Sequence, residues 1–186
     1  MYLSKLGMMS SEEATKSLTS ALKGFHIAAE DSLSVVDKLT KVDMNAAASA
    51  GDIASMLRNY ASTATLAGLD IDQAIAMGTT ILDVSQKDSG SIGNALRTVL
   101  SRYGNVKAGA YSKLNLDNDS ETTENLNDIE KVLRKIGISM RDSQLDMRDF
   151  GDVLDELAEK WNSLDEVSKN ALATAFAGKK VLCPNT

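Results

Sequence analysis

The sequence has few of the residues that usually provide covalent staples or reactive groups. Its 186 residues include one cysteine, Cys183, and one histidine, His26. A single cysteine excludes a disulfide within the chain, and this pair of residues does not form a plausible zinc site. No apolar run approaches the roughly 20 residues that span a bilayer. MYLSKLGMM also lacks the hydrophobic region of a secretory signal. We therefore expect no metal site and no transmembrane segment, and cytoplasmic synthesis.

Proline and aromatic residues are also scarce, with one proline and an aromatic share of 4%. This composition is typical of helical proteins with cores of Ala, Leu, Ile, Val and Met. The apolar share of 43% suffices for one sizeable core or two smaller ones. The net charge of -6 disfavours general attraction to nucleic acid or to anionic membranes. The sequence predicts an all-α fold of short amphipathic helices, packed as hairpins or bundles, without specific nucleic-acid recognition.

A first helical unit of about five helices is predicted over residues 1–110. Capping residues indicate where these helices start: Ser10 with Glu13, Asp31 or Ser32, Ser49 with Asp52, and Asp70 with Gln73. Apolar residues recur at helical spacing after each start: Ala14, Leu18, Leu22, Phe25 and Ala29; Val35, Leu39 and Val42; Ile53, Leu57, Tyr60 and Ala64; Ile71, Ile75, Gly78 and Leu82. Gly68 is the predicted stop of the third helix. His26 lies at the edge of the first face, where we expect no chemistry.

The stretch Ile81–Gly104, ILDVSQKDSGSIGNALRTVLSRYG, allows two interpretations. A phosphate-binding loop at 90–93 would need a preceding strand and a lysine after its last glycine. Thr79, Thr80 and Ile81 instead continue the fourth helix, and Lys87 comes before the glycines. We favour a fifth helix capped by Ser91, with an apolar side of Ile92, Leu96, Val99 and Tyr103. Gly78 and Gly93 are then predicted to allow close helix contacts.

A polar linker is predicted at residues 111–125, which divides the chain into two helical units. A calcium-binding loop is the alternative interpretation of this segment, because four acidic residues fall at loop positions one, three, five and twelve: Asp117, Asp119, Glu121 and Asp128. Thr122 stands where the sharp turn needs glycine, and Asp128 replaces the bidentate glutamate. A solvated acidic loop is therefore favoured.

A second helical unit of about three helices is predicted over 126–178, followed by a tail at 179–186. Its first helix carries Leu126, Ile129, Leu133 and Ile136 and stops at Gly137. A tiny β-hairpin or an irregular turn is expected near 138–147. Asp149 precedes a helix with Phe150, Leu154, Leu157 and Trp161 on one face, and Ser163 with Glu166 opens the last helix. These two helices are predicted to form a hairpin.

No catalytic residues and no cofactor site are predicted. The carboxylates of the penultimate helix lie opposite its apolar stripe, as a solvated face requires: Asp152, Asp155, Glu156 and Glu159. They have no companion nucleophile or metal cluster in the sequence. Seven methionines are interpreted as gap-filling core or interface residues: Met8, Met9, Met44, Met56, Met77, Met140 and Met147. The chain is therefore expected not to be an enzyme.

An ordered series of segments resembles the conserved core of phage tail tape-measure proteins. The series comprises MSSEEATKSLTSALKGF, AEDSLSVVDKLTKV, SAGDIASMLRNYASTATLAGLDIDQAIAM, DSGSIGNALRTVLSRYGNVKAG, IEKVLRKIGISMRDS, RDFGDVLDELAEKWNSL and ALATAFAG. The resemblance covers roughly Leu6 to Gly178. Members usually continue after the final Ala-Gly pair with an Arg-Gln type sequence and hundreds more residues. The chain thus resembles a truncated fragment of a longer protein.

The resemblance implies a structural component of a phage or prophage tail, one that templates the tail tube, sets its length and takes part in genome delivery. Implied partners are copies of the chain and tail-tube, tail-tip or chaperone proteins, and the implied location is the lumen of the tail tube. One alternative is a domesticated, prophage-derived helical adaptor that binds other proteins. A cell-wall hydrolase, which some tape-measure proteins carry as a separate domain, finds no support in the residues.

Overall fold

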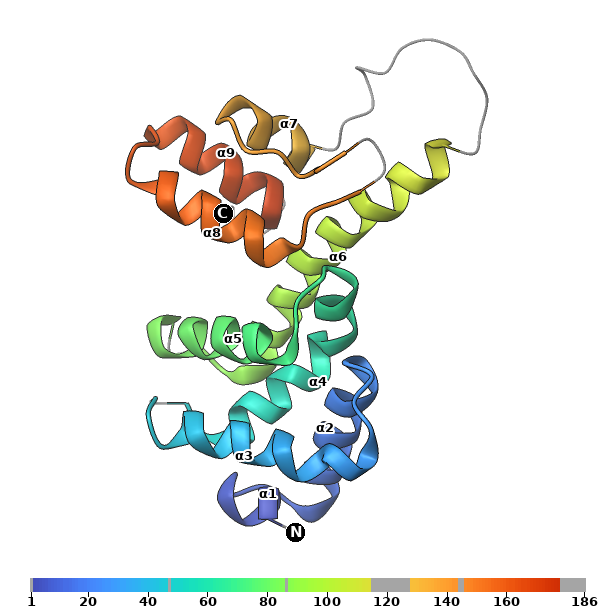
Figure 1. Ribbon diagram of the computed structural model, residues 1–186. Helices are drawn as coiled ribbons and strands as arrows, with labels where there is room; N and C mark the ends of the chain where they lie inside the picture. The colour runs from blue at the N-terminus through green and yellow to red at the C-terminus, as the bar shows by residue number, and fades with distance from the viewer. Residues whose placement is uncertain (1, 47, 86, 115–127, 144–145, 178–186) are drawn as a thin grey trace, which may run out of the picture. The chain divides into compact units, whose positions relative to one another are not determined.

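The structure, a computed structural model, describes residues 2–177 apart from 47, 86, 115–127 and 144–145. The prediction of an all-α fold is confirmed, since the described residues form helices and no sheet (Figure 1). Their one β feature is an isolated antiparallel bridge between Arg141 and Met147, within the region where a tiny hairpin or an irregular turn was expected. The chain divides into two compact units, Met1–Leu100 and Ser101–Thr186, and each is described by itself.

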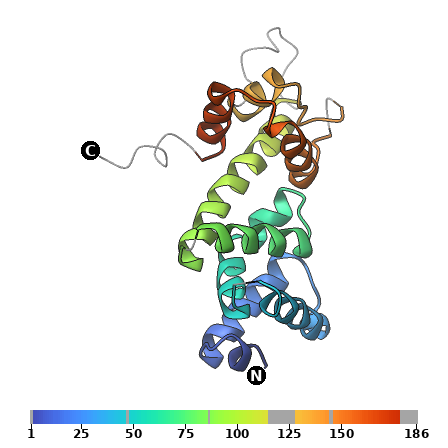
Figure 2. The ribbon, with the colours of Figure 1, turned by 90° about the vertical axis from the view of Figure 1, so that its left-hand side faces the viewer.

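The first unit is built around one central helix. Its elements are α1 (Tyr2–Leu6), α2 (Ser11–Gly24), the 3₁₀ turn η1 (Ala29–Asp31), α3 (Ser32–Asp43), α4 (Ala50–Leu66), α5 (Ile71–Ser85) and the start of α6 (Ser89–Leu114). Helix α4 packs against α1, α2, α3 and α5 (Figures 1 and 2). Its predicted apolar face of Ile53, Leu57, Tyr60 and Ala64 is fully buried. The short α1 was not predicted, because five residues are too few for a periodic pattern.

Three of the predicted helix starts are confirmed by their hydrogen bonds. The Glu13 N–H donates to Ser10 Oγ, and the Glu13 carboxylate accepts from the Ser10 N–H. Ser10 Oγ also donates to the Glu13 carboxylate at 2.9 Å, and this bond, followed by the one from the Ser10 N–H, lowers the pKa of Glu13. Ser49 Oγ accepts from the Asp52 N–H, and Asp70 exchanges the same two bonds with Gln73. The four N-terminal N–H groups of a helix lack intrahelical partners, so these side chains stabilise the first turns.

Two predicted caps are wrong by three and two residues. Helix α6 is capped by Asp88, whose Oδ1 accepts from the Ser91 N–H at 2.8 Å, so Ser91 lies inside the first turn. Helix α9 (Glu166–Ala177) is capped by Asp165 in place of Ser163, because Asp165 Oδ1 accepts from the Ser168 N–H at 2.7 Å. In both cases an aspartate carboxylate stands directly before the helix. Its negative charge interacts favourably with the positive N-terminal end of the helix dipole.

Helix α2 ends earlier than the pattern predicts, so Phe25 and Ala29 are not part of its face. His26 has a φ of 55° and is exposed. The Ile27 N–H donates to the carbonyl of Leu22, and the His26 N–H donates to that of Lys23. These two bonds form a Schellman motif, which favours glycine at the position that His26 occupies. The predicted stops Gly68 and Gly137 occupy the equivalent position of the same motif, with φ of 86° and 76°.

The buried side of α2 consists of small residues: Ala14, Ser17, Ala21 and Gly24. Leu18 and Leu22, which were predicted on the core face, are only half-buried. A Cβ placed on Gly24 would lie 2.5 Å from Ala61 Cβ and 3.0 Å from backbone atoms of α4. The two helices therefore approach at their backbones. The close approach of α2 to α4, rather than hydrophobicity alone, therefore determines which side of α2 faces inward.

The second unit contains the remainder of α6 together with α7 (Asp128–Lys135), α8 (Phe150–Trp161) and α9. Helix α6 continues through Leu114, so residues 111–114 of the predicted linker are helical; residues 115–125 lie outside the described part of the chain. Division of the chain into domains at 111–125 stays a prediction. The tail at 179–186 and Leu126 also lie outside the described residues.

An aromatic cluster fixes the start of α8. The rings of Tyr103 and Phe150 contact each other edge to face, with their centroids 4.9 Å apart. The centroids of Phe150 and Phe176 are 6.0 Å apart in the same kind of contact. Phe150 begins α8 and Phe176 lies near the end of α9, while Lys169 near the start of α9 stacks on Trp161 at the end of α8. The two helices thus form the predicted antiparallel hairpin (Figure 1).

Two ion-pair clusters hold the irregular segment between α7 and α8. Glu130 on α7 is 2% exposed, and its carboxylate accepts from Arg141 Nε at 2.9 Å and from Nη2 at 3.2 Å. Glu156 on α8 accepts from Arg148 at 2.6 Å and from Lys160 at 3.0 Å. The bond from Arg148 and then that from Lys160 lower the pKa of Glu156. Buried charges need such partners.

Candidate functional site

The glycines at 90 and 93 lie inside the first turns of α6, so the phosphate-loop interpretation fails. Thr79, Thr80 and Ile81 belong to α5, as predicted, and no strand precedes the glycines within the described residues. Gly93 is buried, and a Cβ there would lie 2.8 Å from the carbonyl oxygen of Met56. At Gly78 a Cβ would collide with Met56 and Tyr60. The predicted close approach of a second helix is confirmed at Gly93, whereas the space beside Gly78 is filled by the side chains of Met56 and Tyr60 from α4.

The other sequence candidates do not converge. Asp152, Asp155 and Glu159 are exposed on α8, as predicted, whereas Glu156 is engaged by its two cations. Asp117, Asp119 and Glu121 of the alternative calcium-binding loop, like Cys183, lie outside the described residues. Within the part of the chain that is described, no three His, Cys, Asp or Glu side chains gather as metal ligands would.

The seven methionines differ widely in exposure, and Met9, Met77 and Met147 are half-buried. Met56 and Met140 are buried core residues, with exposed fractions of 0% and 1%. Met8 and Met44 are exposed by 97% and 80%, so they are not core residues, and an interface role for them stays a prediction. Tyr60 next to Met56 donates its hydroxyl to the Ala74 carbonyl at 2.7 Å, and burial raises its pKa. Tyr60 and Met56 thus complete the core of the first unit.

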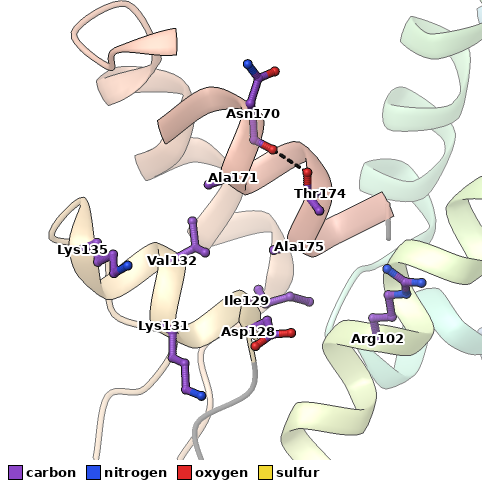
Figure 3. A pocket seen from close by; sticks show the side chains of 10 residues that line it. All are labelled: Arg102, Asp128, Ile129, Lys131, Val132, Lys135, Asn170, Ala171, Thr174 and Ala175. Carbon is purple, nitrogen blue, oxygen red and sulfur yellow. Dashed lines mark hydrogen bonds between the residues drawn. The ribbon is translucent and has the colours of Figure 1, made fainter. Parts of the chain in front are cut away.

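Within the described second unit, a groove with a volume of about 770 Å³ lies between α7 and α9. Figure 3 shows the residues around it. They are Arg102, Asp128, Ile129, Lys131, Val132, Lys135, Asn170, Ala171, Thr174 and Ala175. Helix α7 supplies one wall and α9 the other, and these two helices pack against each other.

Helical spacing places apolar and basic residues side by side along the α7 wall. Ile129 and Leu133 are buried beneath it, whereas Val132 is half-buried and faces the groove. Lys131 and Lys135 are four residues apart, so they share one side of α7, and both are exposed. Arg102 on α6 donates to the Phe176 carbonyl at 3.4 Å at the end of α9. The lining contains three cations and one carboxylate, Asp128.

The α9 wall is formed by small side chains. Ala171 and Ala175 are half-buried and four residues apart, with Thr174 between them bonded to the Asn170 carbonyl. Among the described side chains of α9, Leu172 alone is fully buried, and Val167 is 79% exposed. This groove was not predicted from the sequence. The basic pair on α7 and the alanine spacing on α9 were visible, but nothing in the sequence showed that the two helices are neighbours.

A smaller hollow of about 190 Å³ lies in the first unit between α1, α2 and α3. Leu3, Leu18 and Val36 line it, and Leu33 at its edge is 58% exposed. Its remaining lining consists of alanine, serine and threonine side chains, and it includes no charged residue. This hollow offers apolar contact but no group suited to chemistry.

Comparison with known families assigns the chain. A model of the phage-related minor tail protein family matches residues 1–178. The chain belongs to this family. The match extends over both helical units. It confirms the phage-tail part of the resemblance: the chain is a structural protein of a phage tail, and the family supports a location in the virion tail. None of the described helices has an apolar stretch long enough to span a bilayer. No solved structure matches the chain significantly.

Proposed function

We propose that the chain is the conserved core segment of a tape-measure protein, the tail component that templates tube assembly and sets tail length. The observation that carries the proposal is the minor tail protein match over residues 1–178. The ordered segments from MSSEEATKSLTSALKGF to ALATAFAG support the narrower assignment, because their series resembles the tape-measure core.

Arithmetic on helix length supports a role as one module of a longer ruler. A helix rises about 1.5 Å per residue, so 186 residues in one helix would reach only about 280 Å. The chain folds into short helices, and the longest one described is α6 with 26 residues. Length measurement would therefore depend on further sequence. The segment would supply helical units that bind tail proteins or other copies of the chain inside the tube.

A non-enzymatic role forms part of the same proposal. The carboxylates with a lowered pKa are occupied structurally: Glu13, Asp88 and Asp165 cap helices, and Glu156 is ion-paired. Catalytic carboxylates are typically perturbed inside a cleft, beside a substrate position. A gel zymogram with embedded peptidoglycan checks this point. We expect no clearing, and a clear band at the mass of the chain would refute it.

Electron microscopy of assembled tails tests the tape-measure role. In the phage or prophage that encodes the chain, codons 1–178 are deleted in frame, and a second strain carries only the exposed-site substitution Lys41→Ala as a control. We expect the deletion to leave no tails or tails of uneven length, and the control to leave tails unchanged. Tails of normal number and uniform length after the deletion would overturn the proposal. Protease protection of the chain within purified tails tests its expected place in the lumen.

A further inference from the structure

We propose that the groove between α7 and α9 is a docking site for an acidic amphipathic helix of a partner protein. The proposal goes beyond the tape-measure assignment and does not depend on it. It rests on the cations along the groove, the small-residue wall of α9 and the volume of the groove.

Among the described side chains of the second unit, the cations without an ion-pair partner lie at this groove. Among the described side chains of the unit, five cations have carboxylate partners: Arg134, Arg141, Arg148, Lys160 and Lys169. Arg102, Lys131 and Lys135 have none among the described residues, and all three line the groove. An acidic occupant would supply the missing counter-charges.

The wall of α9 is suited to a helix. Ala171 and Ala175 repeat the spacing of small residues by which α2 packs closely on α4 in the first unit. Small side chains let helix backbones approach, and the opposite wall provides Val132 as an apolar contact. The half-buried state of Ala171 and Ala175 means that an occupant would bury further apolar surface on α9.

The size of the groove agrees with one short helix. A helix about 10 Å wide with a pitch of about 5.4 Å occupies roughly 420 Å³ per turn. The groove volume of about 770 Å³ therefore corresponds to about two turns of such a helix, or to a longer helix that is only partly seated. Nucleic acid fits less well, because Asp128 would repel its phosphates and the apolar side chains of Val132, Ala171 and Ala175 offer them no donors.

Fluorescence polarisation with a designed peptide tests the proposal. The probe is a fluorescein-labelled, 15-residue helix with Ala and Leu on one face and Glu on the flanks, and a scrambled peptide of the same composition serves as control. With the full chain we expect saturable binding of the probe with a Kd of tens of micromolar, which weakens as salt is raised. We expect the scrambled peptide to bind at least tenfold more weakly.

Variants locate the bound peptide. The double substitution Lys131→Glu with Lys135→Glu should weaken binding at least tenfold, whereas Lys41→Glu on the exposed side of α3 should leave it unchanged. Ala171→Leu should also weaken binding, because it fills the groove without changing its charge. Circular dichroism of each variant shows whether its helices are retained; if the double variant is unfolded, Ala171→Leu and the single substitution Lys135→Glu decide.

Three results would overturn the proposal. The first is no saturable binding up to about 1 mM peptide, and the second is binding that folded groove variants do not change. The third is equally tight, lysine-dependent binding of a 15-nucleotide single-stranded DNA, which would make the groove a general polyanion site. Failure of peptide binding would leave the tail-length phenotype of the deletion untouched, so the two proposals fail separately.

Discussion

Adding one methyl group at Gly24 should destabilise the first unit. A Cβ at this position would lie 2.5 Å from Ala61 Cβ and 3.0 Å from the backbone of α4 at Ala61 and Ser62. Carbon atoms normally pack about 3.5–4.0 Å apart, so the methyl groups overlap by more than about 1 Å. Neither methyl group can rotate away. Helix α2 must therefore move away from α4, and its other buried small residues lose contact.

The magnitude follows from two opposing effects. Overpacking of this kind costs about 1–3 kcal/mol. Alanine is better than glycine inside a helix by about 0.5–1 kcal/mol, which offsets part of that cost. We expect Gly24→Ala to lower the free energy of unfolding by about 1–2 kcal/mol, which is a substantial share of the stability of a small helical unit.

Urea unfolding monitored by circular dichroism provides the measurement, and a double-mutant cycle assigns the cause. Ala61→Gly removes the methyl group that the new Cβ would meet. In that background Gly24→Ala should cost at least about 1 kcal/mol less than in the wild type, although the two backbone contacts at 3.0 Å remain. The control is Gly90→Ala on α6, where a Cβ would meet only one atom, the capping oxygen Asp88 Oδ1, at 3.1 Å.

Either of two results would contradict the packing argument. One is a Gly24→Ala variant as stable as the wild type, which would mean that the helices are not in backbone contact. The other is an equal cost with and without the Ala61 methyl group, which would place the strain elsewhere. Gly90→Ala is expected to be neutral or slightly stabilising. If it destabilised the protein as much as Gly24→Ala, the loss would be a general effect of replacing a helix glycine.

Three further substitutions have clear expected outcomes. Glu130→Ala leaves Arg141 without its buried partner and should cost about 2–3 kcal/mol in urea unfolding; a loss below about 0.5 kcal/mol would contradict it. His26→Gly should stabilise by about 0.5–1 kcal/mol in the same assay, because glycine adopts a φ of 55° without strain; unchanged or lower stability would count against the motif. Glu156→Gln should destabilise at pH 7 but hardly at pH 2. The bond from Arg148 lowers the folded-state pKa of Glu156, so the stabilisation is present above the unfolded pKa of about 4.3 and is lost as the pH falls through the folded value. A pH-independent difference would refute this.

Helix starts and stops were predictable where their chemistry is local. The pairs Ser10 with Glu13 and Asp70 with Gln73 satisfy free N–H groups within four residues of the chain, and they form as expected. Gly68 ends its helix for an equally local reason. His26 was missed because a histidine gives no signal for left-handed backbone. Its conformation depends on the hydrogen bonds that close α2.

The inward face of α2 and the groove were not predictable from hydrophobic periodicity. Leu18 and Leu22 carry the strongest hydrophobic signal on α2, yet Ser17 and Ala21 face α4, since only small residues permit the close approach. The site on α7 and α9 depends on two helices about forty residues apart in the sequence becoming neighbours. Single-sequence patterns contain no information on such a distant pairing.

The contact between Gly7 and Gly51 has a consequence for how this sequence can diverge. A Cβ at Gly51 would run into the Gly7 carbonyl, and a Cβ at Gly7 would lie 2.7 Å from Gly51 Cα. Neither position can acquire a side chain while the other stays in place. A substitution at either glycine therefore requires α1 to move away from α4. Among descendants of this sequence, the two glycines should be inherited as a pair or lost together with the docked first helix.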